Sequence, residues 1–211
     1  ELLSRNSESV GGSVDEAGGR KTGGVILVGT KPVDGLTHAA VRRAGLPRGR
    51  VIGSGTVLDS ARLRHLLSRH CKVDIHNVHA YVLGEHGDSE FAAWSMTHIA
   101  GMSMDEYCPA CGRCRDWKAE RCKIEQAVRD SAYHVIGYKG ATYFAVGQAL
   151  TRISAAVLRG QNSVLTVSTE LEGEYGIRGV SLSVPAIVSR EGVVRVVAGR
   201  LAPEEQASLE A

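Results

Sequence analysis

The sequence predicts an α/β protein in which a small parallel unit is followed by a larger α+β region. A β-branched apolar run, a helical segment and a second apolar run follow one another with short links within 25–53, which is the order of a βαβ unit. Nearer the end of the chain, three runs rich in β-branched residues are separated by the turn signals "EYG" and "REG", a pattern typical of antiparallel strands. The 211 residues suffice for one large domain or two small ones.

Composition restricts the class of protein further. Hydrophobic residues make up 43% of the chain and charged residues 23%, which is typical of soluble globular proteins. The net charge of +2 and the lack of a long apolar run predict neither a nucleic-acid partner nor a membrane partner. Five cysteines, an odd number, do not resemble a secreted disulfide framework, so we expect a cytoplasmic protein with reduced thiols.

The first part of the chain begins with a segment that is rich in glycine and serine. Residues 1–23 are expected to form a poor helix, because each interior glycine costs about 1 kcal/mol relative to alanine. The apolar and polar patterns then predict a strand at 25–30, a turn at 31–35, a helix at 35–45 that stops at Gly45, and a strand at 50–53.

The remainder alternates between helical and extended patterns. Four leucines at helical spacing predict a helix at 57–71: Leu58, Leu63, Leu66 and Leu67. The later segments are predicted to be a strand at 78–84, a cysteine-rich loop at 107–114, helices at 117–136 and 141–159, strands at 163–171, 179–189 and 192–199, and a last helix from 202.

Two glycine-rich stretches fall short of known phosphate-binding motifs. "GSGTVL" (53–58) lacks the third glycine of G-x-G-x-x-G, and "GGRKTGG" (18–24) lacks the G-K-[ST] ending. Within these 211 residues there is therefore no intact dinucleotide fingerprint. The run "CPACGRC", with Cys122 beyond it, has a spacing that could bind zinc or an iron–sulfur cluster. Two separate C-x2-C pairs would be the stronger pattern, so we expect free thiols and no metal site.

The segments "DSARLR" and "GEHGDSE" contain a set of residues suited to acid–base chemistry. Asp59 and Arg62 are three apart on a predicted helix and share a face, whereas Arg64 points elsewhere. A carboxylate can orient an imidazole such as that of His86, and an arginine fork can bind a substrate carboxylate. The set fits proton transfer on a small anionic substrate. By spacing alone, a simple surface ion pair between Asp59 and Arg62 is the favoured interpretation.

Longer motifs resemble a known family. "GSGTVLDSARLRHLL" followed by "NVHAYVLGEHGDSE" resembles the lactate/malate dehydrogenase superfamily, in particular its bacterial L-lactate dehydrogenases. "TKPVDGLTHAAVRRAGLPRGRVIGSGT", "KGATYFAVGQALTRI" and "EGEYGIRGVSLSVPAIV" match in the same order, so the similarity runs from about Arg5 to the C-terminus. It implies that 1–54 form the last part of a Rossmann parallel sheet, and that 55–211 form the α+β catalytic domain of the lactate/malate dehydrogenase fold.

The resemblance implies a reaction and a role for single residues. The reaction is the reversible reduction of pyruvate to L-lactate with NADH, so the expected cofactor is NAD. His86 would be the acid/base, with an ordinary pKa of roughly 6.5 that suits proton transfer near neutrality. Asp59 would orient His86, and Arg62 would bind the substrate carboxylate. Further contacts with the substrate are implied from Thr142, beside the methyl group, and from Lys31. Contacts with the cofactor are implied from Thr30, Lys31 and Ser54.

The resemblance also implies regulation and assembly. Arg64 and His79 match the positions that bind fructose 1,6-bisphosphate in allosteric bacterial lactate dehydrogenases; the alternative is a solvated arginine and an ordinary strand histidine. The intact enzyme would be a cytoplasmic homotetramer. The run "YCPACGRC" resembles a loop of clostridial-type members, which further disfavours a metal site.

Three departures from the family pattern stand out. The cofactor fingerprint and a mobile loop with a second arginine would lie before Glu1, so we expect the start of the protein to be missing. Lys31 replaces a family asparagine, and its charge would disfavour an oxidised nicotinamide and lower the pKa of His86. Residues 9–23 have glycine, serine and charges where the family has an apolar helix, which would weaken packing against the sheet.

These departures predict weak NAD binding and little turnover for the 211 residues alone. Two other functions remain open. One is a different 2-hydroxy-acid dehydrogenase, acting on malate or a branched-chain acid. The other is a non-catalytic fragment that binds only the effector or associates with full-length subunits.

Overall fold

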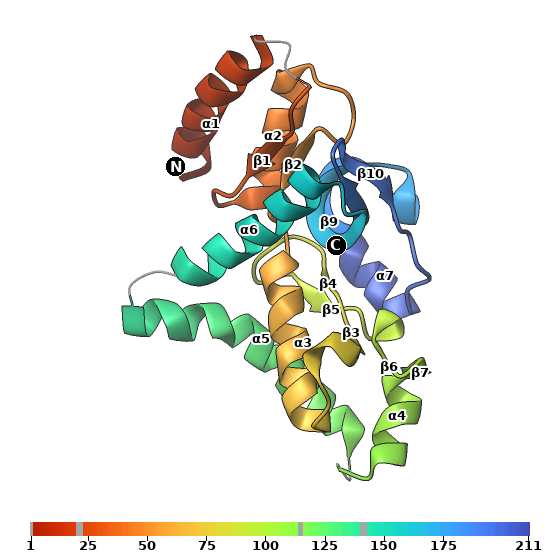
Figure 1. Ribbon diagram of the computed structural model, residues 1–211. Helices are drawn as coiled ribbons and strands as arrows, with labels where there is room; N and C mark the ends of the chain where they lie inside the picture. Colours follow the sequence, from red (N-terminus) through yellow and green to blue (C-terminus); the bar gives the residue numbers. More distant parts are fainter. Residues whose placement is uncertain (1, 20–22, 114–115, 140–142) are drawn as a thin grey trace.

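The computed structural model describes residues 2–19, 23–113, 116–139 and 143–211. Two groups of elements lie one above the other in Figure 1. The upper group consists of the main sheet with its helices, and the lower group is built around α3 (Val57–Cys71), α4 (Met104–Cys111) and α5 (Trp117–Lys139). None of the described helices is long and apolar enough to cross a membrane.

The main sheet has five strands in the order β1-β2-β8-β9-β10. β1 (Ile26–Val28) and β2 (Val51–Gly53) are parallel and are joined by α2 (Val33–Ala44), as the βαβ pattern predicts. The predicted antiparallel strands are β8 (Ser163–Glu172), β9 (Arg178–Ser189) and β10 (Gly192–Val196). β2 pairs antiparallel with β8 through Gly53 and Ser168, so both predicted parts of the chain belong to one mixed sheet.

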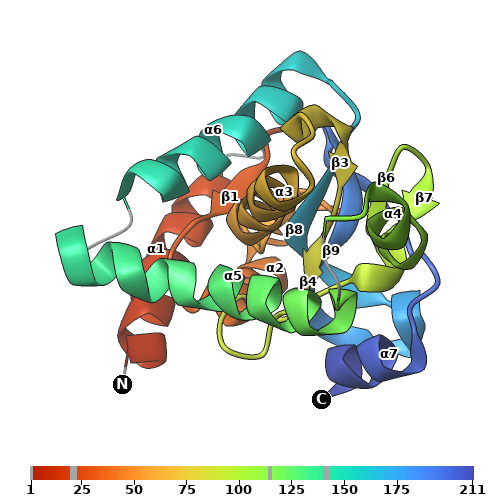
Figure 2. The same ribbon diagram turned by 90° about the horizontal axis from the view of Figure 1, so that it is seen from below.

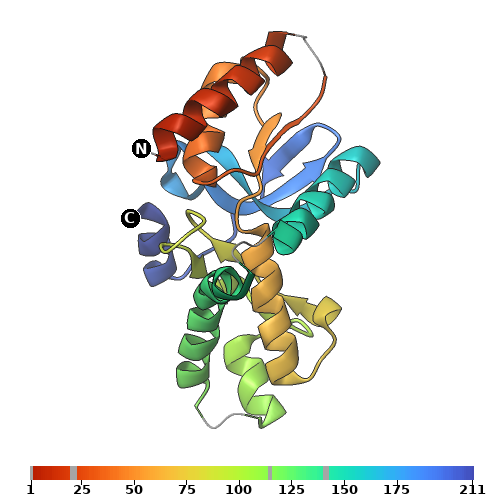
Figure 3. The same ribbon diagram turned by 90° about the vertical axis from the view of Figure 1, so that its left-hand side faces the viewer.

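Helices cover both faces of this sheet, as Figure 3 shows. On one face, α6 (Tyr143–Arg159) buries Ile153 and Ala156 against Leu165 and Val167 of β8. On the other face, α2 packs against β8 and β9 with smaller and more polar side chains between them. Because the side chains of a strand alternate between faces, the polar face of β8 and β9 lies beside α2. This polar face later contributes to the site.

The first helix corrects the prediction that residues 1–23 form a poor helix. α1 (Leu2–Gly19) is helical over 18 residues despite its glycines. Val10 and Val14 pack into an apolar cluster with α2 and β1, and the Arg43 guanidinium donates two hydrogen bonds, of 2.6 and 2.5 Å, to Asp15. Tertiary packing of an amphipathic face thus outweighs the low helix propensity of the segment.

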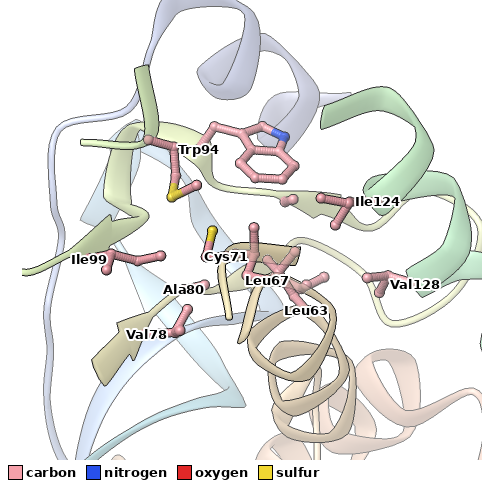
Figure 4. Close-up of a cluster of buried hydrophobic side chains, with 12 residues drawn as sticks. Leu63, Leu67, Cys71, Val78, Ala80, Trp94, Ile99, Ile124 and Val128 are labelled. Atoms are coloured by element: carbon pink, nitrogen blue, oxygen red, sulfur yellow. The ribbon is translucent and has the colours of Figure 1, made fainter. Parts of the chain in front are cut away.

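The lower group is organised around α3, whose bounds agree with the predicted helix at 57–71. Leu63 and Leu67 are fully buried, while Leu58 and Leu66 are partly buried. Figure 4 shows Leu63, Leu67 and Cys71 facing Trp94 and Ile99 across this cluster, with side chains of α5 closing one side. The view from below in Figure 2 shows α5 crossing beside α3.

Two more predicted segments differ from the structure. The single strand predicted at 78–84 is two short strands, β3 (Val78–His79) and β4 (Val82–Leu83), because the two pair with different partners. β3 pairs with β6 (His98–Ile99), which in turn pairs with β7 (Met102–Ser103). β4 pairs with β5 (Phe91–Ala92). The predicted cysteine-rich loop is helical as far as Cys111, because Ser103 and Glu106 form a capping box at the start of α4. Cys114 lies outside the described residues.

The helix α2 begins at Val33, inside the predicted turn at 31–35. Pro32 precedes the first turn, where its missing N–H costs nothing. Gly45 ends α2 with φ of 58°, as predicted, and α7 (Pro203–Glu210) is the predicted last helix. Asp34 is therefore a residue of the first turn of α2, and this placement matters for the site.

Candidate active site

Three parts of the chain converge on one buried cluster. The first turns of α3 carry Asp59 and Arg62, the loop between β4 and β5 carries His86 and Glu90, and the start of α2 carries Asp34. The loop is attached to the main sheet at Gly84, whose N–H and C=O both pair with Ser183 of β9. Gly84 has φ of 98°, a conformation that favours glycine and turns the chain towards α3.

Asp59 connects His86 with Arg62. Its Oδ2 lies 2.9 Å from His86 Nδ1, and its Oδ1 accepts a 2.8 Å hydrogen bond from Arg62 Nη1. The Asp59 side chain is 2% exposed and the Arg62 side chain 14%, so the ion pair is buried and not a surface pair. Burial disfavours the charge of the Asp59 carboxyl, but His86 and Arg62 hold its pKa below the usual value.

A second carboxylate faces the same ring nitrogen. Glu90 Oε2 lies 3.2 Å from His86 Nδ1, and Glu90 is buried. Sequence reasoning missed this residue, because it lies in a loop, where a spacing of four residues from His86 does not imply contact. One carboxylate oxygen each of Asp59 and Glu90 and one ring nitrogen of His86 lie within 4.8 Å of one another, a spacing that also suits the ligands of a metal ion. A ring N–H between two carboxylates accounts for the same convergence without one.

Asp34 is a further buried acid that sequence reasoning missed. Its Oδ2 accepts a 2.7 Å hydrogen bond from the backbone N–H of His86, and its Oδ1 accepts one of 3.0 Å from Ser183 Oγ. Burial raises the pKa of Asp34, while these hydrogen bonds favour its charged form. Asp34 therefore fixes the main chain of the histidine loop against both α2 and β9.

The electrostatic surroundings favour a protonated His86. Burial by itself disfavours the imidazolium, but the carboxylates of Asp59 and Glu90 beside Nδ1 outweigh this effect and raise the pKa of His86 to about 9. Lys31 acts in the opposite direction, as its charge predicts, but its contribution is smaller than that of the carboxylates. The resulting pKa lies well above the ordinary value expected from the sequence.

The predicted cofactor residues lie at the carboxyl ends of the two parallel strands. Thr30 and Lys31 follow β1 and are exposed, and Ser54 follows β2 and donates its N–H to the carbonyl of Val28. The carboxyl edge of a parallel sheet is where α/β proteins bind nucleotides. Thr142, predicted beside the substrate methyl group, lies outside the described residues.

The predicted effector residues line a separate cavity. Arg64 and His79 border a space of about 450 Å³ between α3, β3 and α6, together with His76 and Arg152. Arg64 donates to the carbonyl of Ala80, and burial lowers its pKa. In the described part of the chain, neither Arg64 nor Arg152 forms a salt bridge with a carboxylate.

Comparison with known proteins agrees with the fold and with this arrangement. Residues 56–211 match the family described as lactate/malate dehydrogenase, alpha/beta C-terminal domain. The chain belongs to the lactate/malate dehydrogenase family. The family membership and fold class expected from the sequence are therefore confirmed.

Members of this family with curated names include close relatives. The L-lactate dehydrogenase of Treponema denticola is 54% identical over 212 residues, which cover 100% of this chain and 67% of the relative. The L-lactate dehydrogenase of Thermoanaerobacterium saccharolyticum is 52% identical over 86% of this chain and 58% of the relative. The chain thus spans about three fifths to two thirds of these relatives.

Solved structures of dehydrogenases superpose closely. A lactate dehydrogenase from a Medee basin deep-sea metagenome library gives a TM-score of 0.93 at 38% identity, covering 99% of this chain and 66% of that one. The ligand-bound minor L-lactate dehydrogenase of Enterococcus mundtii gives 0.91 at 37% identity, covering 97% and 65%. The arrangement of elements described above is therefore that of a lactate dehydrogenase over the compared region.

Proposed function

We propose that this chain carries the catalytic groups of an NAD-dependent L-lactate dehydrogenase that interconverts pyruvate and L-lactate. The observation that carries the proposal is the buried cluster in which Asp59 holds His86 Nδ1 through one oxygen and Arg62 through the other. A proton donor and a carboxylate-binding cation are thereby fixed side by side. The names of the relatives support the choice of substrate.

The geometry supports a role for each group. Because Nδ1 of His86 faces two carboxylates, Nε2 is the nitrogen left to give its proton to the pyruvate carbonyl oxygen and to take it back in the reverse direction. Arg62 uses one Nη for Asp59, and its other N–H groups are left for the substrate carboxylate. Burial strengthens both interactions by excluding water.

NAD, when bound, supplies and accepts the hydride. The polar residues at the carboxyl ends of β1 and β2, namely the exposed Thr30 and Lys31 and the half-buried Ser54, fit the nicotinamide end of such a cofactor. The positive charge of Lys31 opposes the oxidised ring, which carries a positive charge itself. These 211 residues contain no glycine fingerprint that would bind the phosphates and the adenosine of the cofactor.

The proposed regulatory site is the cavity lined by Arg64 and His79. Arg64 is half-buried and Arg152 is exposed, and among the described residues neither has a carboxylate partner. Two such guanidinium groups favour a multiply charged anion, and fructose 1,6-bisphosphate fits this chemistry. Calorimetry of the chain with fructose 1,6-bisphosphate tests the site. Heat of binding that is lost in Arg64→Ala but kept in Arg69→Ala, an exposed arginine of the same helix, would support it. No heat from folded protein would refute it.

Assembly as a cytoplasmic homotetramer belongs to the same proposal. Binding of the effector without turnover would favour the alternative of a non-catalytic chain. Analytical ultracentrifugation of the chain joined to the unmatched part of the T. denticola relative measures the number of subunits. A monomer would contradict the tetramer.

Turnover tests the proposed reaction. We would place the part of the T. denticola relative that these residues leave unmatched before Glu1, and measure NADH oxidation with pyruvate. Oxaloacetate and branched-chain 2-oxo acids are the competing substrates. We expect the highest kcat/KM with pyruvate. A preference for one of the competing acids would assign a different 2-hydroxy-acid dehydrogenase, and no turnover with any of them would refute the enzyme.

A further inference from the structure

Glu90 has a place in the cluster that the acid–base scheme does not yet use. Its carboxylate is buried and its Oε2 accepts a hydrogen bond from His86 Nδ1 at 3.2 Å. Asp59 Oδ2 is closer to the same nitrogen, at 2.9 Å, yet this buried oxygen receives no well-directed hydrogen bond. Distance therefore favours Asp59, whereas the direction of the ring N–H favours Glu90.

The main chain of the loop has hydrogen bonds of its own, and the Glu90 carboxylate interacts with the Gly87 backbone as well as with the His86 ring. The backbone N–H of Glu90 donates to the carbonyl of Gly87, and the carbonyl of Glu90 accepts a hydrogen bond from Arg129 Nε at 3.3 Å. The main chain on the other side of His86 is fixed by Gly84 and Ser183. Burying a carboxylate costs free energy unless it is paired, and the ring of His86 is the partner that the geometry provides.

The charges around His86 come from four segments. Asp59 and Arg62 belong to α3, Glu90 to the histidine loop, Asp34 to α2, and Lys31 to the segment between β1 and α2. With His86 protonated, the two carboxylates nearest the ring face two cations, the imidazolium and the Arg62 guanidinium. Loss of the ring proton would leave two buried carboxylates facing one guanidinium, which is unfavourable.

We propose that Glu90 is a second positioning residue of His86, which holds the Nδ1–H of the ring together with Asp59 and keeps the imidazole protonated and ready to donate from Nε2. The inference rests on the proposed role of His86 as the acid/base. Under this proposal, the orientation of the imidazole depends on two carboxylates, Asp59 and Glu90, and not on Asp59 alone. Burial and the charge of Asp59 raise the pKa of Glu90, which is consistent with two carboxylates competing for one proton donor.

Nuclear magnetic resonance of the chain itself tests the inference without cofactor or substrate. Ring nitrogen signals of His86, assigned by their loss in His86→Gln, would be followed against pH in wild type and in Glu90→Gln. Glutamine keeps the shape and removes the charge, so we expect the pKa of His86 to fall by about 1, a tenfold change in its proton affinity. The matched control is Glu85→Gln, an exposed glutamate one residue before His86, which should leave the titration unchanged.

A His86 titration in folded Glu90→Gln that coincides with wild type would overturn the proposal. If Glu90→Gln does not fold, the side-chain carboxyl carbon of Glu90 in wild type provides the same decision. We expect its signal to shift as the His86 ring titrates, and no shift would equally overturn the proposal. Because neither measurement involves turnover, their outcome is separate from whether the protein reduces pyruvate.

Discussion

At the scale of single residues, the site depends on buried acids whose charges are balanced by contact. Asp59 is almost fully buried, and an unpaired carboxylate at such a position would be strongly destabilising. Its two oxygens instead serve two different cations. The sequence predicts this arrangement in part, because Asp59 and Arg62 are three residues apart on a helix that was predicted with the correct bounds.

The other acids of the site could not be found in the same way. Asp34 bonds to the backbone of His86, which is 52 residues away, and no local pattern connects the two. Glu90 lies four residues from His86, but in a loop this spacing does not imply contact as it does in a helix. Both acids act through burial, and burial is set by the packing of the whole chain.

Replacing Arg62 with lysine tests its role as a fork for the substrate carboxylate. Lysine keeps the charge but cannot hold Asp59 and a substrate carboxylate with separate N–H groups in one plane. Loss of about 3 kcal/mol of charge-assisted hydrogen bonding predicts a fall of about 100-fold in kcat/KM for pyruvate. The matched change Arg69→Lys, at an exposed position of α3, should have little effect. Equal kcat/KM for Arg62→Lys and Arg69→Lys would remove Arg62 from the site.

Replacing Lys31 with asparagine tests the departure from the family pattern. The charge of Lys31 lowers the pKa of His86, so its removal should raise that pKa further above its ordinary value. It should also strengthen NAD⁺ binding, because a like charge beside the nicotinamide is lost. Ring titration and NAD⁺ affinity are the measurements. Lys72→Asn is a suitable control, since Lys72 is exposed and has φ of 54°, a conformation that asparagine tolerates. Unchanged values in Lys31→Asn would show that Lys31 is too far away to matter.

At the scale of elements, the predictions succeed where packing and local pattern agree. The helix α3 and the strands β8, β9 and β10 have strong periodicity and clear turns, and they form as predicted. The segment 78–84 reads as one apolar strand, but its two halves pair with different partners, a choice that only the fold decides. In α1, propensity argues against a helix, whereas Val10, Val14 and the Asp15–Arg43 pair stabilise one.

Two neighbouring glycines of α1 test whether this segment is helical. A Cβ at position 12 would meet nothing within 4 Å, whereas one at position 11 would lie 2.7 Å from Arg43 Nη1. Gly12→Ala should therefore raise the free energy of unfolding by about 0.5–1 kcal/mol. Gly11→Ala should gain less, because it disturbs the guanidinium that pairs with Asp15. Urea unfolding followed by circular dichroism measures both, and a destabilising Gly12→Ala would contradict a helical α1.

At the scale of the whole molecule, the site crosses the boundary predicted at residues 54 and 55. Asp34 and Lys31 come from the first predicted domain, and Asp59, His86 and Glu90 from the second. The mixed sheet joins the two parts through Gly53 and Ser168. The polar face of this sheet anchors both Asp34 and the histidine loop through Ser183. The division of the chain at residues 54 and 55, which the family resemblance implies, does not foresee this shared support.

The rate of pyruvate reduction with and without His86 tests the central claim most directly. The measurement uses the chain joined to the unmatched part of the T. denticola relative, with Glu85→Gln as the control for changes in the same loop. Removal of a general acid–base group costs about 10²–10⁴-fold in rate, so His86→Gln should lose at least about 100-fold in kcat while Glu85→Gln keeps the rate of the unchanged protein. A His86→Gln protein that reduces pyruvate within a few-fold of the unchanged rate would contradict the assignment of His86 as the proton donor.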